Sequence, residues 1–120
     1  VTRAWVNNGG DIALHLTPAQ SVRIGLYADL SRLSVDEILE GVQTDGQFEV
    51  ASGLPVRGVA TSGWRGRSLS RGIADSVTVL AANAAMADVA ATVIANAVDV
   101  ADPAVERRPA RAVRHNRLPP

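Results

Sequence analysis

The sequence contains no cysteine and no lysine, and each absence removes a class of chemistry. Without cysteine there are no disulfides, no thiolate catalysis and no cysteine-ligated zinc. The compartment is left open, with the cytoplasm slightly favoured. Without lysine there is neither a Schiff-base residue nor a P-loop lysine. All twelve basic residues are arginines, and twelve acidic residues balance them, so no global field favours nucleic acid or an acidic membrane.

Aromatic residues and long apolar runs are also scarce. Only four residues are aromatic, although 47% of the 120 residues are apolar. The core must therefore consist of Val, Ile, Leu and many Ala, which favours a close approach of backbone elements. No apolar run approaches the roughly 20 residues that span a bilayer, so no membrane span is expected. The length fits one small domain.

Short alternating segments near the N-terminus predict an antiparallel meander. Its three strands are expected at residues 2–6, 11–16 and 22–26. The first two are separated by Asn7-Asn8-Gly9-Gly10, a strong hairpin signal, and the last two by a Thr17-Pro18 break. Because the chain starts at Val1 directly in strand-like sequence, we expect further sequence before it in the parent protein.

The remainder of the chain predicts further strands, a short helix and one long helix. Strands are expected at 48–51, 56–60 and 76–80, a mobile loop at 63–72, and a capping-box helix at 35–40. An Ala-rich helix should cover 84–97, with Asn83 as its N-cap. Strands followed by a packed C-terminal helix, without regular βαβ alternation, indicate the α+β class.

Two regions are predicted from composition. Residues 1–100 form the domain, and residues 101–120 form a tail with four prolines and five arginines against two acids. We expect most of this tail to be a solvated extension. The rest of the chain carries a net negative charge, so the tail could also lie against its own domain.

The long helix carries the clearest candidate for a metal site. Asp88 and Thr92 are four residues apart and therefore share one helix face. A carboxylate and a hydroxyl are hard oxygen donors that suit Mg²⁺, which takes one or two protein carboxylates together with waters and substrate phosphates. From spacing alone, an ordinary solvated face is the commoner explanation.

Two glycine-containing turns are weaker candidates for ligand contacts. Thr61, Ser62 and Gly63 end a predicted strand, where backbone N–H groups could approach an anion, although an ordinary turn has the same sequence. Gly9-Gly10-Asp11 permits close ligand approach or simply a hairpin turn. His15 shares a predicted strand face with Asp11, so a proton-transfer pair is conceivable.

Arginines 65, 67 and 71 could form a phosphate clamp, or they could be surface charge.

In their order along the chain, four segments resemble the ApbE family of Mg²⁺-dependent FAD:protein FMN transferases. The segments are Asn8-Gly9-Gly10-Asp11-Ile12, Ala60-Thr61-Ser62-Gly63, Ser76-Val77-Thr78-Val79 and Ala87-Asp88-Val89-Ala90-Ala91-Thr92. The resemblance covers most of the chain outside the tail and is that of the C-terminal part of the family's domain. It implies an ApbE-like α+β fold.

The resemblance also implies a site and a reaction. Asp88 and Thr92 become ligands of a Mg²⁺ at the FAD pyrophosphate. The turns at Gly9, Gly10 and Asp11 and at 61–63 would lie near the flavin nucleotide. FMN would then be transferred to a Thr or Ser of a protein substrate.

One stretch departs from the family pattern. Transferases of the family carry a His-x-x-Asp-Pro-type motif before the Ser-Val-Thr-Val strand, whereas residues 67–75 contain neither His nor Pro. In this respect the chain resembles a branch of ApbE-like proteins whose activity is not assigned. A flavin- or nucleotide-binding module without chemistry is therefore the alternative to an enzyme.

Partners follow from the same reasoning. A flavin nucleotide and a protein substrate are expected, and a small Ala-rich core makes association with further sequence or with a second copy plausible. A nucleic-acid role for the arginine-rich tail is a much weaker third interpretation, and no nucleic acid is predicted.

Overall fold

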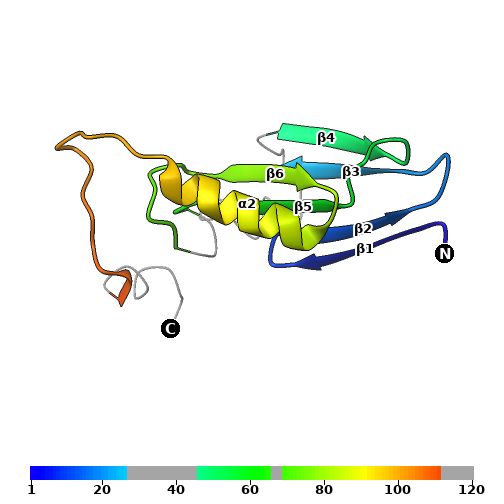
Figure 1. The fold of residues 1–120 in the computed structure, drawn as a ribbon, viewed down its shortest axis with the longest axis horizontal. Helices are drawn as coiled ribbons and strands as arrows, with labels where there is room; N and C mark the ends of the chain where they lie inside the picture. Colours follow the sequence, from blue (N-terminus) through cyan, green and yellow to red (C-terminus); the bar gives the residue numbers. More distant parts are fainter. Residues whose placement is uncertain (27–45, 66–68, 112–120) are drawn as a thin grey trace, which may run out of the picture.

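Six strands and one long helix build the described part of the chain, residues 1–26, 46–65 and 69–111 of a computed structural model (Figure 1). The strands are β1 (Arg3–Asn8), β2 (Asp11–Leu16), β3 (Ser21–Leu26), β4 (Gly46–Ala51), β5 (Gly58–Ser62) and β6 (Val77–Ala81), and the helix is α2 (Ala84–Ala97). The predicted α+β class is confirmed, and the long helix has the predicted bounds. The helix predicted at 35–40 lies outside the described residues.

The strands divide into two antiparallel sheets. One sheet has the order β1-β2-β5-β6, and the other pairs β3 with β4. The predicted meander is therefore wrong at its third strand. After the Thr17-Pro18 break the chain passes through Ala19 at φ 67°, and β3 pairs with β4 instead of β2.

An aliphatic core joins the two sheets. Its buried members are Leu14, Leu16, Ile24, Val50 and Val59. The first two and Val59 lie on one face of the four-stranded sheet, because residues two apart on a strand share a face. Ile24 and Val50 come from the β3–β4 pair. The smaller sheet thus covers this face of the larger one, and no aromatic ring is needed at the centre.

Helix α2 covers the opposite face of the larger sheet through small side chains. Ala87 and Ala91, one helical turn apart, pack fully buried against Ala60 of β5. At Gly58, an added Cβ would lie 2.1 Å from the Asn83 carbonyl carbon, so the strand backbone meets the start of the helix directly. Asn83 caps that start by accepting the Met86 N–H at 2.9 Å, as predicted. Alanine and glycine therefore set the separation between α2 and the sheet.

The outward face of α2 carries exposed apolar side chains. Met86, Val89, Val93 and Ile94 are each at least 46% exposed. Within residues 1–26, 46–65 and 69–111, no helix is long and apolar enough to cross a membrane. Association through this face with further sequence or a second copy stays a prediction.

Enlarging the alanine interface should destabilise the fold. Ala91→Leu would push a large side chain between α2 and β5, and we expect it to cost about 1–3 kcal/mol of unfolding free energy. Urea denaturation followed by circular dichroism measures this cost. Val93→Leu, on the exposed face, is the matched control and should change stability by less than about 0.5 kcal/mol. Equal effects of the two variants would contradict the packing described.

Candidate functional site

A tight hairpin places Asp11 at the end of the larger sheet. Asn8 pairs with Asp11 across the turn, and Gly9 and Gly10 between them have φ values of 67° and 110°. Positive φ at both central residues is the geometry of two-residue hairpins and explains the two glycines. Asn7 Oδ1 accepts the Gly10 N–H at 2.9 Å. No atom lies within 4 Å of a Cβ built on Gly10, so this side of the turn is open.

The end of β5 meets this hairpin. The strand runs two residues further than predicted, so Thr61 and Ser62 belong to it. The Thr61 backbone N–H lies close enough to the Asp11 carboxylate to lower its pKa. The Thr61 hydroxyl forms a hydrogen bond with the Thr78 hydroxyl at 2.9 Å. Both lie on the face of the sheet away from α2, so the Thr61 hydroxyl does not point toward Asp88 or Thr92. Ser62 lies on the helix side of the strand, next to Ala60 in the alternation.

Gly63 has a structural role that the sequence does not reveal. Its φ is 154°, and an added Cβ would lie 2.3 Å from the Asp75 carbonyl oxygen. The space that a side chain would take at residue 63 is therefore occupied by the backbone of Asp75. Glycine is therefore required here for packing, and its predicted contact with a ligand stays a prediction.

Helix α2 brings a second carboxylate to Asp11. Asp88 follows the buried Ala87 and is exposed on the flank of the helix. Its charge is close enough to raise the pKa of Asp11. Thr92 lies one turn further along the same exposed flank. Three segments separated by about 50 and 30 residues along the chain, at 11, 61 and 88, thus converge at one place.

Burial and charge repulsion act together on Asp11. Desolvation is the larger cause that raises its pKa and the Asp88 carboxylate the second, while the hydrogen bond from the Thr61 N–H lowers it. None of the ion pairs among the described residues involves either carboxylate. Two carboxylates that repel each other, with neither paired to an arginine among the described residues, are a setting in which a cation is stabilised.

The donor set fits Mg²⁺ only in part. Asp88, Thr92 and Asp11 supply hard oxygen atoms, as the ion requires. The described residues contain no cluster of three or more His, Cys, Asp or Glu side chains that could enclose a metal by themselves. A bound Mg²⁺ would therefore keep several positions for water and for phosphate oxygens, which is its ordinary habit in phosphate sites.

His15 does not belong to this site. It lies on the same face of β2 as Asp11 but four residues away, which corresponds to about 13 Å along a strand. A direct proton-transfer pair between the two is therefore wrong. His115 lies outside the described residues.

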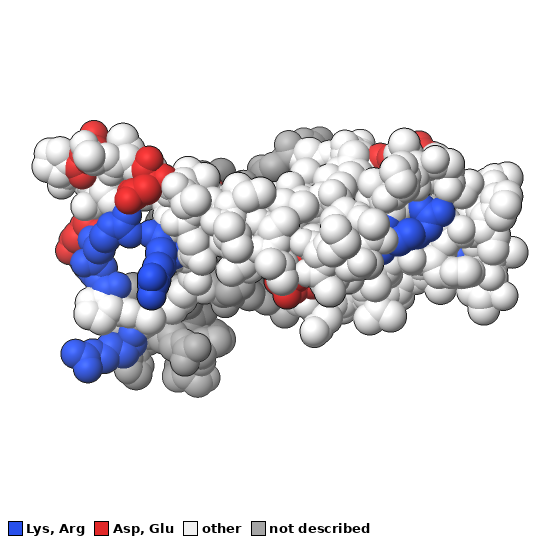
Figure 2. All heavy atoms as spheres, in the orientation of Figure 1, with Lys and Arg blue, Asp and Glu red and all other residues white. Residues whose placement is uncertain are grey.

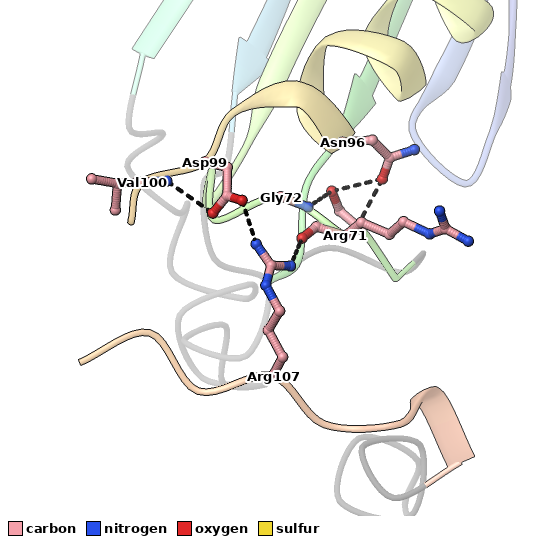
Figure 3. Close-up of polar contacts among 7 residues, drawn as sticks. Arg71, Gly72, Asn96, Asp99, Val100 and Arg107 are labelled. Atoms are coloured by element: carbon pink, nitrogen blue, oxygen red, sulfur yellow. Dashed lines mark hydrogen bonds and ion pairs between the residues drawn. The ribbon is translucent and has the colours of Figure 1, made fainter. Parts of the chain in front are cut away.

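Sequence reasoning missed Asn96. Its Oδ1 accepts the Arg71 N–H at 2.8 Å and the Ser70 hydroxyl at 3.2 Å, fixing the loop to the end of α2 (Figure 3). The signal was the spacing, because Asn96 follows Thr92 by four residues as Thr92 follows Asp88. The described part of the predicted mobile loop is thus anchored.

The C-terminal tail is also anchored. Arg107 pairs with Asp99 at 2.7 Å and donates to the Arg71 carbonyl oxygen (Figure 3). Figure 2 shows arginine side chains gathered at this end of the molecule. The described part of the tail therefore contacts its own domain instead of extending freely over its whole length.

A hollow of about 1130 Å³ lies between the loop and the tail, within residues 64–75 and 104–110. Of the residues predicted to contact a ligand, Arg71 lines it, whereas the candidates at Asp11, Thr61, Asp88 and Thr92 do not. Arg107 and Arg108 in its wall are neutralised by Asp99 and Glu106. Two of its arginines are thus paired, one of them with Asp99 of the domain, whereas Asp11 and Asp88 take part in no ion pair among the described residues.

Fold and site together define an α+β protein in which a helix carboxylate faces a hairpin carboxylate at the end of an antiparallel sheet. The family model described as AbpE bacteria matches residues 1–117. The chain belongs to this family.

Archaeal relatives extend the comparison. The UPF0280 protein of Methanothermobacter thermautotrophicus is 46% identical over 98 residues, which cover 81% of this chain and 34% of that protein. The UPF0280 protein of Methanoculleus marisnigri is 39% identical over 103 residues, covering 83% and 37%. The chain therefore spans about a third of the length of these relatives. No solved structure matches it significantly.

Removing the Asp88 charge should lower the pKa of Asp11. We expect Asp88→Asn to shift the Asp11 titration to lower pH, while burial still holds its pKa above the ordinary value. A carboxyl ¹³C NMR titration of the metal-free protein measures the shift. Asp102→Asn, in the tail, should leave Asp11 unchanged, and an unchanged titration in Asp88→Asn would contradict the convergence of the two carboxylates.

The same coupling predicts a pH dependence of stability. Because folding raises the pKa of Asp11, its contribution to stability is full below its ordinary pKa and is lost as the pH rises through the raised one. Asp88→Asn should therefore be the more stable protein at neutral pH. Its advantage should disappear in acid, where protonated Asp11 is no longer repelled, and urea denaturation at several pH values tests this.

Proposed function

We propose that this protein binds the pyrophosphate of a flavin dinucleotide through Mg²⁺ and acts on it, as an ApbE-like FMN transferase or a related pyrophosphate enzyme. The observation that carries the proposal is the convergence of Asp11, the Thr61 N–H and Asp88, from three of the four segments that resemble the ApbE family. Membership of the AbpE bacteria family also supports the proposed ApbE-like function.

The roles of the residues follow from their positions. Asp88 and Thr92 would hold the metal on the exposed flank of α2. The Asp11 carboxylate, beside the Thr61 N–H, would accept from a metal-bound water or a ligand hydroxyl. The hairpin at Gly9 and Gly10 leaves open space for the nucleotide. A bound Mg²⁺ would neutralise negative charge that develops on the phosphate oxygens.

A second candidate is a flavin- or nucleotide-binding module without turnover. It is favoured by the absence of histidine from residues 67–75. Within residues 1–26, 46–65 and 69–111, the sole histidine is His15, at the opposite end of β2 from Asp11. A base for activating an acceptor hydroxyl would have to be Asp11 itself or come from elsewhere in the protein.

Binding of FAD should depend on both Mg²⁺ and Asp88. We expect Asp88→Ala to weaken Mg²⁺-dependent binding by at least about tenfold, because loss of a carboxylate ligand removes a charge-assisted contact to the metal. Isothermal titration with FAD, with Mg²⁺ or with EDTA, measures this. Glu49→Ala, which removes an exposed carboxylate of β4, is the control and should bind normally. Affinity indifferent to both metal and Asp88 would defeat the proposal.

Release of AMP separates the two candidates. Transfer of FMN to a Thr or Ser hydroxyl and hydrolysis of FAD both break the pyrophosphate and liberate AMP. An enzyme should release AMP from FAD in the presence of Mg²⁺, and Asp88→Ala should abolish the release. Tight Mg²⁺-dependent binding without AMP, with and without acceptor proteins, would instead establish the binding module.

A further inference from the structure

Arg71 has a backbone that is held from both sides. Its N–H donates to Asn96 Oδ1 at 2.8 Å, and its carbonyl oxygen accepts from the Arg107 guanidinium (Figure 3). Arg107 is itself oriented by Asp99. The helix end and the tail therefore fix the position from which the Arg71 side chain starts.

The next two residues press the same loop onto the end of α2. An ideal Cβ on Gly72 would lie 1.8 Å from the Ala95 carbonyl oxygen, so only glycine fits this contact. The Ile73 N–H donates to the Val98 carbonyl oxygen at 2.8 Å. Such anchoring lowers the entropy that a ligand contact from this loop would cost.

The Arg71 guanidinium, in contrast, has no partner among the described residues. Three other arginines at this end form ion pairs, Arg65 with Asp75, Arg107 with Asp99 and Arg108 with Glu106. Arg71 makes only backbone hydrogen bonds. In Figure 3 its side chain extends past Asn96 and away from Arg107. An exposed guanidinium with a fixed backbone and no paired carboxylate is suited to bind an anion.

The predicted metal ligands lie on the same side of the helix as this loop. Asp88, Thr92 and Asn96 follow each other at intervals of four residues and form one stripe along α2. At 1.5 Å per residue, Thr92 is about 6 Å from Asn96 along the helix axis and Asp88 about 12 Å. An extended arginine reaches roughly 6–7 Å from its Cα, so a ligand lying along the stripe could contact the metal site and Arg71 together.

We propose that the Arg71 guanidinium binds a phosphate group of the ligand whose pyrophosphate is held at Asp88 and Thr92. This inference rests on the proposed function. It assigns to residues 69–73 a role in binding a diphosphate ligand. It also explains why Asn96 and Arg107 fix the backbone of Arg71, whose side chain has no partner among the described residues. The ligand class is a nucleoside diphosphate or dinucleotide, in which two phosphates are adjacent.

The test compares Arg71→Ala with Arg23→Ala, which removes the same charge from β3 in the other sheet. Inorganic pyrophosphate and FAD are titrated into the protein with Mg²⁺. Arg71→Ala should weaken both by about tenfold, because an Arg–phosphate pair is charge-assisted. Arg71→Lys should recover part of the affinity, since it keeps the charge but not the two-pronged geometry. Thermal stability should be unchanged, because Arg71 contributes only its backbone groups to the hydrogen bonds that anchor the loop.

A second readout keeps this inference separate from the metal. The Nε–Hε NMR signal of Arg71, assigned from its loss in Arg71→Ala, should move when inorganic pyrophosphate is added in EDTA. If it moves while Mg²⁺ and Asp88 prove irrelevant to binding, Arg71 stands as the phosphate contact and the metal role fails. If Asp88→Ala weakens Mg²⁺-dependent binding but Arg71→Ala binds like the wild type, the proposed function stands and the Arg71 inference is overturned. Failure of both variants to alter binding rejects both.

Discussion

The close contact between the alanine face of α2 and β5 is the constraint on which the site depends. Ala60, Ala87 and Ala91 are almost completely buried in it, and Gly58 removes the last side chain from the start of the helix. A larger residue in this interface would lift the helix away from the sheet. Asp88, which adjoins the buried alanines, would then move away from Asp11. Small side chains in this interface, in place of aromatic ones, therefore bring the two carboxylates close together.

The same contact creates an electrostatic cost that a ligand can relieve. Asp11 is partly desolvated and repelled by Asp88, and only the Thr61 N–H offsets these effects. A divalent cation between the carboxylates would replace repulsion by attraction, while the exposed position of Asp88 leaves the cation open to phosphate oxygens. Arg71, at the far end of the same helix flank, adds a fixed positive charge. With a bound cation, the flank would combine the two kinds of positive group that phosphate recognition uses.

Much of the local structure could be predicted from the sequence, because local signals determine it. Asn83 marked the start of α2, and the glycine pair marked the β1–β2 turn. The pairing of β3 with β4 could not be predicted, since it depends on the shared aliphatic core between two sheets. The shared helix flank of Asp88 and Thr92 could be predicted from their spacing, while their role as metal ligands stays a prediction. Asn96 was missed because its partner loop is brought to it only by the tertiary fold.

The central claim is that one cation site joins the β1–β2 hairpin, the end of β5 and the flank of α2. Paramagnetic relaxation by Mn²⁺ in place of Mg²⁺, followed in amide NMR spectra, tests it most directly. The account predicts that broadening is strongest for the signals of residues 10–12, 60–63 and 88–92 and falls steeply with distance from them, so that it is weaker at His15 and in β3. Broadening that is instead centred on the acidic residues of the tail, Asp102 and Glu106, would contradict the account.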